Sequence, residues 1–237
     1  MEEAPPPLPV SSITVTLPFS SRSSSPLPAP PSAPPSALEA AAASYAARWR
    51  GVPSRVRPPR ASLPEAAWAF AGCCAGIGSL ALLHTFLALP AGLALLTPAF
   101  AASAVLLYGV PSSPLGQPRN VVLGHAGSAL VGVSLRQLIV ALPAWPAAAP
   151  VTQAGAEVLA GTLAVALSTS CMMLCGVTHP PGAATALIAV MGSRAVTDLG
   201  FLYIPLVVAS ALVVVAAALL VNNASGLQGR QYPAFAW

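Results

Sequence analysis

The chain has 237 residues, of which 56% are hydrophobic and only 7% charged, and its formal net charge is +4. Soluble proteins carry charge on about a quarter of their residues, so this composition excludes an ordinary soluble domain and indicates a membrane protein. The positive charge comes from arginine alone, and most of the arginines precede Pro64. The basic charge therefore belongs mainly to one segment, and no patterned basic face points to nucleic acid as a partner.

Residues 1–63 are rich in proline, serine and arginine and contain no apolar run long enough to enter a bilayer. Such a composition cannot bury enough apolar surface to form a packed core, so we expect this segment to be disordered. Enrichment in serine and arginine with few acidic residues is typical of an organelle transit peptide. The alternative is a disordered N-terminal tail on a protein of another cellular membrane.

Long apolar stretches separated by short polar turns follow from residue 64 onward. Two further stretches are broken by proline, and the second of them reaches only about half a bilayer at about 1.5 Å per residue. We therefore predict an all-α fold, a polytopic transmembrane helix bundle with four long helices and two broken or half helices over residues 64–223, before a short polar tail at 224–237. The long stretches are about 65–89, 120–142, 153–175 and 199–221, and the broken ones are about 92–110 and 182–192.

The sequence Thr178-His179-Pro180-Pro181-Gly182-Ala183 interrupts one of the most apolar parts of the chain. A helix cannot run unbroken through two consecutive prolines, so a new helix is expected to begin near Gly182. The first N–H groups of a helix are unpaired and carry partial positive charge, which suits an anion. This arrangement predicts a small-anion site at Thr178, His179, Gly182 and Ala183. The alternatives are that His179 only caps a helix carbonyl and that the threonine hydroxyls bond to their own helix.

The two broken stretches resemble each other. Ala101-Ala102-Ser103-Ala104-Val105-Leu106 matches Ala183-Ala184-Thr185-Ala186-Leu187-Ile188 in step, which indicates a duplicated unit of long helix, broken segment and long helix. Transporters often place substrate between paired discontinuous helices. We therefore expect a binding point where the helix N-termini near Ala102 and Gly182 face each other, and Ser103 joins the predicted site. Chance similarity in an alanine-rich chain is the alternative, and a parallel and an inverted repeat both remain open.

Three motifs occur in the order expected for one family: Pro114-Leu115-Gly116-Gln117-Pro118-Arg119-Asn120, then His179-Pro180-Pro181-Gly182-Ala183, then Asn222-Asn223 after the last long helix. On these motifs the region 64–223 resembles the HPP family of integral membrane proteins. Ala101 is a departure, because the family has glycine in that run. Plant members resemble nitrite transporters of the plastid envelope. The resemblance implies transport of nitrite across the chloroplast inner envelope membrane, and it makes the N-terminal segment a plastid transit peptide.

The remaining polar residues of the membrane region have competing interpretations. Arg119, in the turn before the third long stretch, is either a substrate-binding residue or an interfacial anchor. Arg136 is expected to pair with Glu157 as a structural contact between helices. His125, on an otherwise apolar helix, is more typical of a satisfied interhelical donor than of a ligand. Cys171 and Cys175 stand at helical spacing before His179, but the proline break disrupts that register and disfavours a metal site.

We therefore expect a membrane transporter of small anions, most simply nitrite, that is no enzyme and needs no cofactor, since no catalytic constellation has a usable spacing. The partners expected are nitrite and the lipid bilayer, and the oligomeric state, including a homo-oligomer, stays open. Proton coupling through His179 is a further hypothesis. The alternatives are a passive channel for another small solute and a non-transporting membrane scaffold or assembly protein.

Overall fold

The computed structural model describes residues 36–48, 60–140, 150–227 and 230–235. These residues fall in two compact units, 1–58 and 59–237. In the first unit the described residues form helix α1 (Ala37–Arg48), which the sequence analysis did not predict. The backbone N–H and the hydroxyl of Ser36 donate to the Glu39 carboxylate at 2.8 Å each, and these bonds lower the pKa of Glu39. The transit-peptide prediction rests mainly on residues 1–35 and 49–59, which lie outside the described residues.

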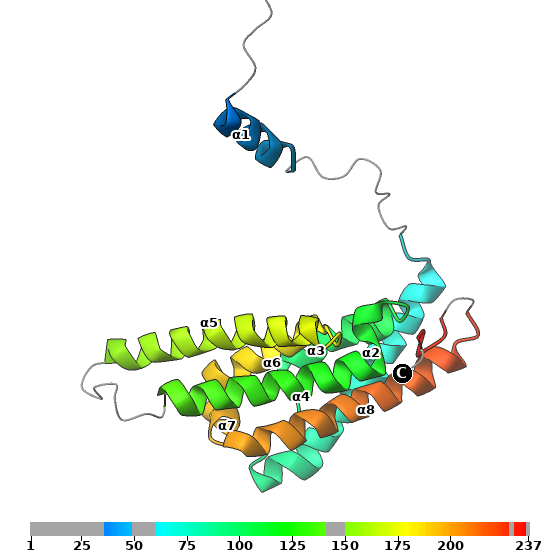
Figure 1. Cartoon of the computed structure of the whole chain (residues 1–237). Coiled ribbons are helices and arrows are strands. Elements are labelled where there is room, and N and C mark those ends of the chain that lie inside the picture. Colours follow the sequence, from blue (N-terminus) through cyan, green and yellow to red (C-terminus); the bar gives the residue numbers. More distant parts are fainter. Residues whose placement is uncertain (1–35, 49–59, 141–149, 228–229, 236–237) are drawn as a thin grey trace, which may run out of the picture. The chain divides into compact units, whose positions relative to one another are not determined.

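The second unit is a bundle of helices, and its described residues include no strand (Figure 1). Three helices continue as single π-helical turns, which are labelled η1 (His84–Ala88), η3 (Val105–Gly109) and η5 (Arg136–Val140). Short 3₁₀ turns are η2 (Leu89–Ala91), η4 (Pro114–Gly116) and η6 (Gly200–Leu202). The α-helices are α2 (Leu63–Leu83), α3 (Pro98–Ala104), α4 (Pro118–Leu135), α5 (Pro150–Leu174), α6 (Pro180–Met191), α7 (Arg194–Thr197) and α8 (Tyr203–Ala224).

Four helical segments of the described chain are long and apolar enough to cross a membrane. Their outer faces carry large apolar side chains, among them Leu63, Phe70 and Leu220, which are each more than 70% exposed. A bilayer would cover such side chains with acyl chains, and the helices satisfy their own backbone groups. The predicted all-α transmembrane bundle is therefore confirmed. The four segments are Leu63–Ala91, Pro118–Ile139, Ala154–Leu174 and Gly200–Ala224.

The two broken stretches form short apolar helices over Pro98–Gly109 and Pro180–Met191. Both begin at a proline, Pro98 and Pro180, and so a few residues before Ala102 and Gly182, near which the sequence analysis placed their N-termini. Proline is favourable at the first helical positions because it needs no hydrogen-bond acceptor there and its φ is already helical. The residues directly before them, Thr97 and His179, have extended backbones.

The packing repeats with the duplication. In the duplication α2 corresponds to α5, α3 to α6 and α4 to α8. The contact of α2 with α8 accordingly matches that of α5 with α4, and the contact of α3 with α2 matches that of α6 with α5. The pairs α3–α6 and α4–α8 join corresponding helices of the two repeats. Figure 1 shows that α2 and α4 begin at the end of the bundle where α5 and α8 finish. The first repeat (α2, α3, α4) therefore runs opposite to the second (α5, α6, α8), and the repeat is inverted.

Glycine allows α4 and α6 to approach closely. A Cβ atom on Gly182 would lie 2.8 Å from the carbonyl oxygen of Gly124, and one on Gly124 would lie 2.7 Å from Cβ of His179. Small residues at such crossings are typical of membrane helices. This close approach fixes the start of α6, and with it His179, against the middle of the bundle.

Candidate functional site

His179 is the residue that precedes α6, and its side chain is completely buried. Its Nδ1 lies 2.8 Å from the carbonyl oxygen of Leu115, and its Nε2 lies 2.9 Å from Oγ of Ser103. A carbonyl oxygen can only accept, so Nδ1 of His179 carries the hydrogen. Nε2 is then an acceptor in the neutral ring. Both ring nitrogens of His179 are therefore hydrogen-bonded. The bond to Leu115 joins His179 to the motif Pro114–Asn120.

A second buried histidine lies beside it. The ring of His125, from α4, is 4.8 Å from that of His179 between centroids, in an edge-on arrangement at 65°. Its Nε2 is 2.9 Å from Oγ of the same Ser103, and its Nδ1 is 2.7 Å from Oγ1 of Thr185. Phe100 covers the other side of the His125 ring at 4.6 Å. His125 thus makes hydrogen bonds between helices, as predicted. Its partners are Ser103 and Thr185, which belong to the two broken helices.

Ser103, His125, His179 and Thr185 therefore form one hydrogen-bonded group, which we call the histidine cluster. All four side chains are 0% exposed. They come from α3, α4, the start of α6 and the body of α6, so three helices must pack correctly to assemble the group. Thr178, the other polar residue of the motif, contributes its carbonyl oxygen, which accepts from Nδ2 of Asn120 at 3.0 Å.

The turn before α4 is held mainly by its own residues. Gln117 donates through Nε2 to the carbonyls of Ser113 at 2.7 Å and Pro111 at 3.0 Å. These bonds close the turn and place Leu115 with its carbonyl toward His179. The two motifs that are far apart in the sequence therefore meet through Leu115–His179 and Asn120–Thr178.

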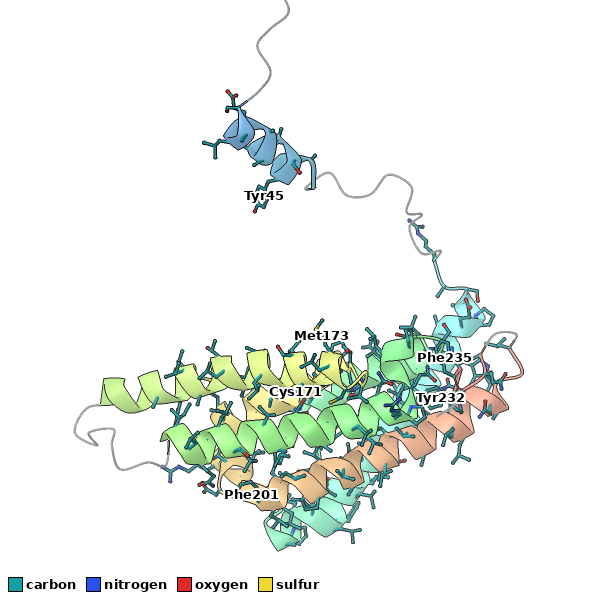
Figure 2. All side chains as sticks on the ribbon, viewed as in Figure 1. Tyr45, Cys171, Met173, Phe201, Tyr232 and Phe235 are labelled. Atoms are coloured by element: carbon teal, nitrogen blue, oxygen red, sulfur yellow. The ribbon has the colours of Figure 1, made fainter. Side chains whose placement is uncertain are left out.

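Residues 230–235, here the C-terminal strap, pack over the same turn near the end of α8, as Figure 2 shows for Tyr232 and Phe235. The Tyr232 hydroxyl donates to the Gly116 carbonyl at 2.9 Å, and the Arg230 guanidinium donates to the Tyr108 carbonyl. Burial raises the pKa of Tyr232 and lowers that of Arg230. Asn223 fixes the strap by donating to the carbonyl of Tyr232 at 2.6 Å and accepting from its N–H at 3.0 Å.

The other residue of the closing motif has a structural role too. Asn222 is buried and donates through Nδ2 to the carbonyl of Leu107 at 3.0 Å. This carbonyl lies in η3, which ends the first broken helix. Asn222 and Asn223 therefore connect α8 to the end of the first broken helix and to the strap.

Three cavities adjoin these elements. The first-end cavity, of about 200 Å³, lies at the end where α4 begins, and its lining includes Pro114, Gln117, Arg119 and Phe235 (Figure 2). The second-end cavity, of about 440 Å³, lies at the opposite end, near α7, and is lined mainly by residues 89–98 and 192–196 together with His84 and Ile188. A side cavity of about 250 Å³ lies between α4 and α5. None of the three is lined by a residue of the histidine cluster.

The remaining predicted site residues are divided among these places. Arg119 is exposed and borders both the first-end and the side cavity. Gly182 is buried against α4, and Ala183 is half-buried on α6. Cys171 and Cys175 line the side cavity, away from His179. The pair Arg136–Glu157 is confirmed at 3.9 Å, and Arg136 also donates to the Val190 carbonyl.

The sequence analysis undervalued His125. A histidine inside a long apolar helix is costly unless it finds a polar partner, and that cost is the signal for a buried polar group. What the sequence did not reveal is that its partners are Ser103 and Thr185. Chemically, the arrangement keeps two imidazoles next to each other, out of contact with water, with a hydroxyl between them.

An all-α bundle with four membrane-spanning helices, two helices that begin inside the bundle and a buried polar cluster where they meet defines an integral membrane protein. Residues 58–233 match the family described as "HPP, transmembrane region". The chain belongs to this HPP family of transmembrane proteins, which confirms the resemblance drawn from its motifs.

Two relatives from Dictyostelium discoideum, each named only as a transmembrane protein, are 41% and 42% identical to this chain over 194 residues. Each alignment covers 81% of this chain and 63% or 57% of the relative. The chain thus spans about three fifths of the length of these relatives. No solved structure matches it.

Proposed function

We propose that this protein transports small inorganic anions across a membrane, with nitrite as the first substrate to test. The observation that carries the proposal is the pair of short apolar helices, Pro98–Gly109 and Pro180–Met191, which contact each other and each begin at a proline after an extended residue. Paired discontinuous helices in an inverted repeat are a common way for transporters to build a substrate site near the midplane. In this arrangement each repeat can tilt against the other and expose the site to one end at a time.

The chemistry of the surroundings favours an anion. Arg119, in the first turn of α4, supplies a positive charge at the first-end cavity. The start of α6 adds no free donor, because Pro180 and Pro181 lack N–H groups and the Gly182 N–H donates to the His179 carbonyl at 2.8 Å. Nitrite itself comes from the resemblance of the HPP motifs to plant proteins of the plastid envelope. The histidine cluster is closed in this structure, so anion passage requires α3 and α6 to separate.

The test is uptake of a panel of small anions by proteoliposomes that contain the full chain. We expect saturable nitrite uptake above that of protein-free vesicles. Arg119→Gln should raise the half-saturating concentration of nitrite about tenfold, the size of an effect near 1.4 kcal/mol. Arg194→Gln is the matched control, because Arg194 is also exposed but lies in α7 and does not line the second-end cavity. Equal effects of the two variants would reduce Arg119 to an interfacial anchor.

A non-transporting scaffold is the second candidate, and a specific observation favours it. The motif residue His179 is fully buried with both ring nitrogens bonded, as in a structural contact. A scaffold predicts no uptake of any solute in the panel by protein that retains its fold. A passive channel predicts flux that does not saturate.

The chloroplast inner envelope is the proposed location. It rests on the composition of residues 1–63 and on the plant members of the family. A fusion of residues 1–63 to a fluorescent reporter should be imported into isolated chloroplasts and shortened on import. A reporter that stays outside the organelle would favour the alternative of another membrane.

A further inference from the structure

The hydrogen bonds of the histidine cluster have only one consistent direction when both rings are neutral. Nδ1–H of His179 donates to the Leu115 carbonyl, so Nε2 of His179 must accept from the Ser103 hydroxyl. The single hydrogen of Ser103 is then used, and Nε2–H of His125 must donate to Ser103. Nδ1 of His125 accepts from Thr185. The chain of donors runs from Thr185 through His125 and Ser103 to His179, at distances of 2.7 to 2.9 Å.

The same atoms can also form the chain with every donor and acceptor role between Thr185 and His179 reversed. If a proton is added to Nδ1 of His125, its Nε2 proton can pass to Ser103 while the Ser103 hydrogen passes to Nε2 of His179. His179 then carries the positive charge, and His125 is neutral with its hydrogen on Nδ1. Thr185 now accepts from His125 and turns its own hydrogen to the Pro181 carbonyl, 3.4 Å away. In this state Nε2–H of His179 donates to Ser103, and the Ser103 hydroxyl donates to Nε2 of His125. The extra proton leaves from Nε2 of His179 to water when α3 and α6 separate, and the starting order returns when His125 exchanges its Nδ1 hydrogen for one on Nε2.

The two ends of this chain point toward different cavities. Leu115, which accepts from His179, lies between Pro114 and Gln117, and both of these line the first-end cavity. Thr185 lies one helical turn before Ile188, which lines the second-end cavity. The cluster therefore occupies the dry section between the cavities at the two ends of the bundle.

Within the part of the chain that the structure describes, no charged side chain bonds to either imidazole of the cluster. The imidazoles bond only to Ser103, Thr185 and the Leu115 carbonyl among the described residues. Of the titratable groups on the surrounding elements, Tyr108 donates to the Val214 carbonyl, and Arg136 pairs with Glu157. Arg119, Cys171 and Cys175 line the side cavity, and the buried Tyr203 hydroxyl interacts weakly with that of Thr97. An imidazolium in such a site is costly unless an anion arrives with it.

We propose that Thr185, His125, Ser103 and His179 form a proton relay that couples proton movement to anion transport, with the two histidines as proton carriers and Ser103 as the shuttle between them. The inference rests on the proposed function. It makes the transported anion the partner that neutralises the buried charge, so that proton and anion move together and electroneutrally. In this relay His125 is as necessary for proton coupling as His179.

The transport experiment loads vesicles with a pH-sensitive dye and follows nitrite uptake and luminal pH together at mildly alkaline pH, with protein-free vesicles as the background for nitrous acid. We expect nitrite uptake to acidify the lumen and an inward proton gradient to accelerate it. Ser103→Ala should reduce the gradient-driven component about tenfold or more, in the range of lost acid–base contributions. Ser210→Ala is the matched control: it removes a fully buried serine hydroxyl of α8 that bonds to the Leu95 carbonyl.

The outcomes separate the two proposals. Saturable nitrite uptake without luminal acidification would leave the proposed function intact and overturn the relay. Absence of uptake for every anion in the panel would overturn both. Equal loss of coupling in Ser103→Ala and Ser210→Ala would assign the effect to packing and also overturn the relay.

A second measurement needs no transport. Nitrogen NMR of the imidazoles in the full chain, which has three histidines, reports which nitrogen carries hydrogen. We expect neutral His179 to be protonated on Nδ1 and neutral His125 on Nε2. Two histidines with the same tautomer at these positions would contradict the direction of the chain, and assignment by His125→Gln keeps the result unambiguous.

Discussion

The two broken helices occupy equivalent places in the inverted repeat, yet they carry different chemistry. α3 begins at Pro98 after Thr97, and α6 begins at Pro180 after His179. The buried Thr97 hydroxyl has only a weak interaction with the Tyr203 hydroxyl, whereas His179 makes two hydrogen bonds through its ring. The duplication therefore sets where the helices begin, and the ionisable group was placed on one side only. A site between the repeats is asymmetric although its scaffold is nearly symmetric.

The largest expected effect concerns how tightly each broken helix is held. Gly124→Ala places a Cβ 2.7 Å from Cβ of His179, and the neighbouring backbone cannot move aside, so we expect a loss of about 1–3 kcal/mol of stability. Gly72→Ala in the other repeat places a Cβ 2.6 Å from Cδ1 and 3.1 Å from Cβ of Tyr108. Tyr108 is fully buried with its hydroxyl bonded to the Val214 carbonyl, so we expect a loss of comparable size. Gly127→Ala, with nothing within 4 Å, is the control. Thermal unfolding in detergent measures all three, and a loss at Gly72 no larger than that at Gly127 would show that only the second broken helix is tightly held.

The next effect compares two buried threonines. Thr185→Val removes the donor to Nδ1 of His125 and leaves a buried nitrogen unpaired, which costs about 1–3 kcal/mol. Thr97→Val has the same change of shape but loses only a weak interaction with the Tyr203 hydroxyl, so we expect a smaller loss of stability. The difference between the two unfolding midpoints is the measurement. A larger loss of stability for Thr97→Val than for Thr185→Val would contradict the view that hydrogen bonds hold α6 more firmly than α3.

The smallest effect tests the strap, which the structure places at one end of the bundle only. Tyr232→Phe removes the hydrogen bond to the Gly116 carbonyl and keeps the ring, so we expect a loss of about 0.5–1.5 kcal/mol. Ser170→Ala is the control, since its hydroxyl bonds only to the Ala166 carbonyl of its own exposed helix face. Protease sensitivity near residue 230 should rise in the first variant and stay unchanged in the second.

Much of the candidate site was predictable from local chemistry, and the arrangement was not. Consecutive prolines predicted the break at His179, and the match between the stretches at Ser103 and Thr185 predicted a pair of broken helices. The expected geometry differed in one respect. The sequence analysis placed the two N-termini face to face near Ala102 and Gly182, whereas the start of α6 meets α3 near its end, through Ser103. The cause is that both helices begin at their prolines and then pass alongside each other.

The strap could not have been predicted by the same means. Residues 224–237 appear as a polar tail in the sequence, but Tyr232 is completely buried in the structure. Its burial depends on Gly116 and Asn223, whose positions come from other elements. Hydropathy describes each residue in its own segment and cannot report such a partner.

The sequence by itself determined the membrane class, the long helices, the two breaks and the family, because helix hydrogen bonds, proline geometry and apolar length act within a few residues of the chain. Only the tertiary structure decided that the repeat is inverted and that Ser103, His125, His179 and Leu115 meet. These contacts join residues from separate helices, and their geometry depends on how closely α4 and α6 approach at Gly124 and Gly182. The function proposed here depends on that approach.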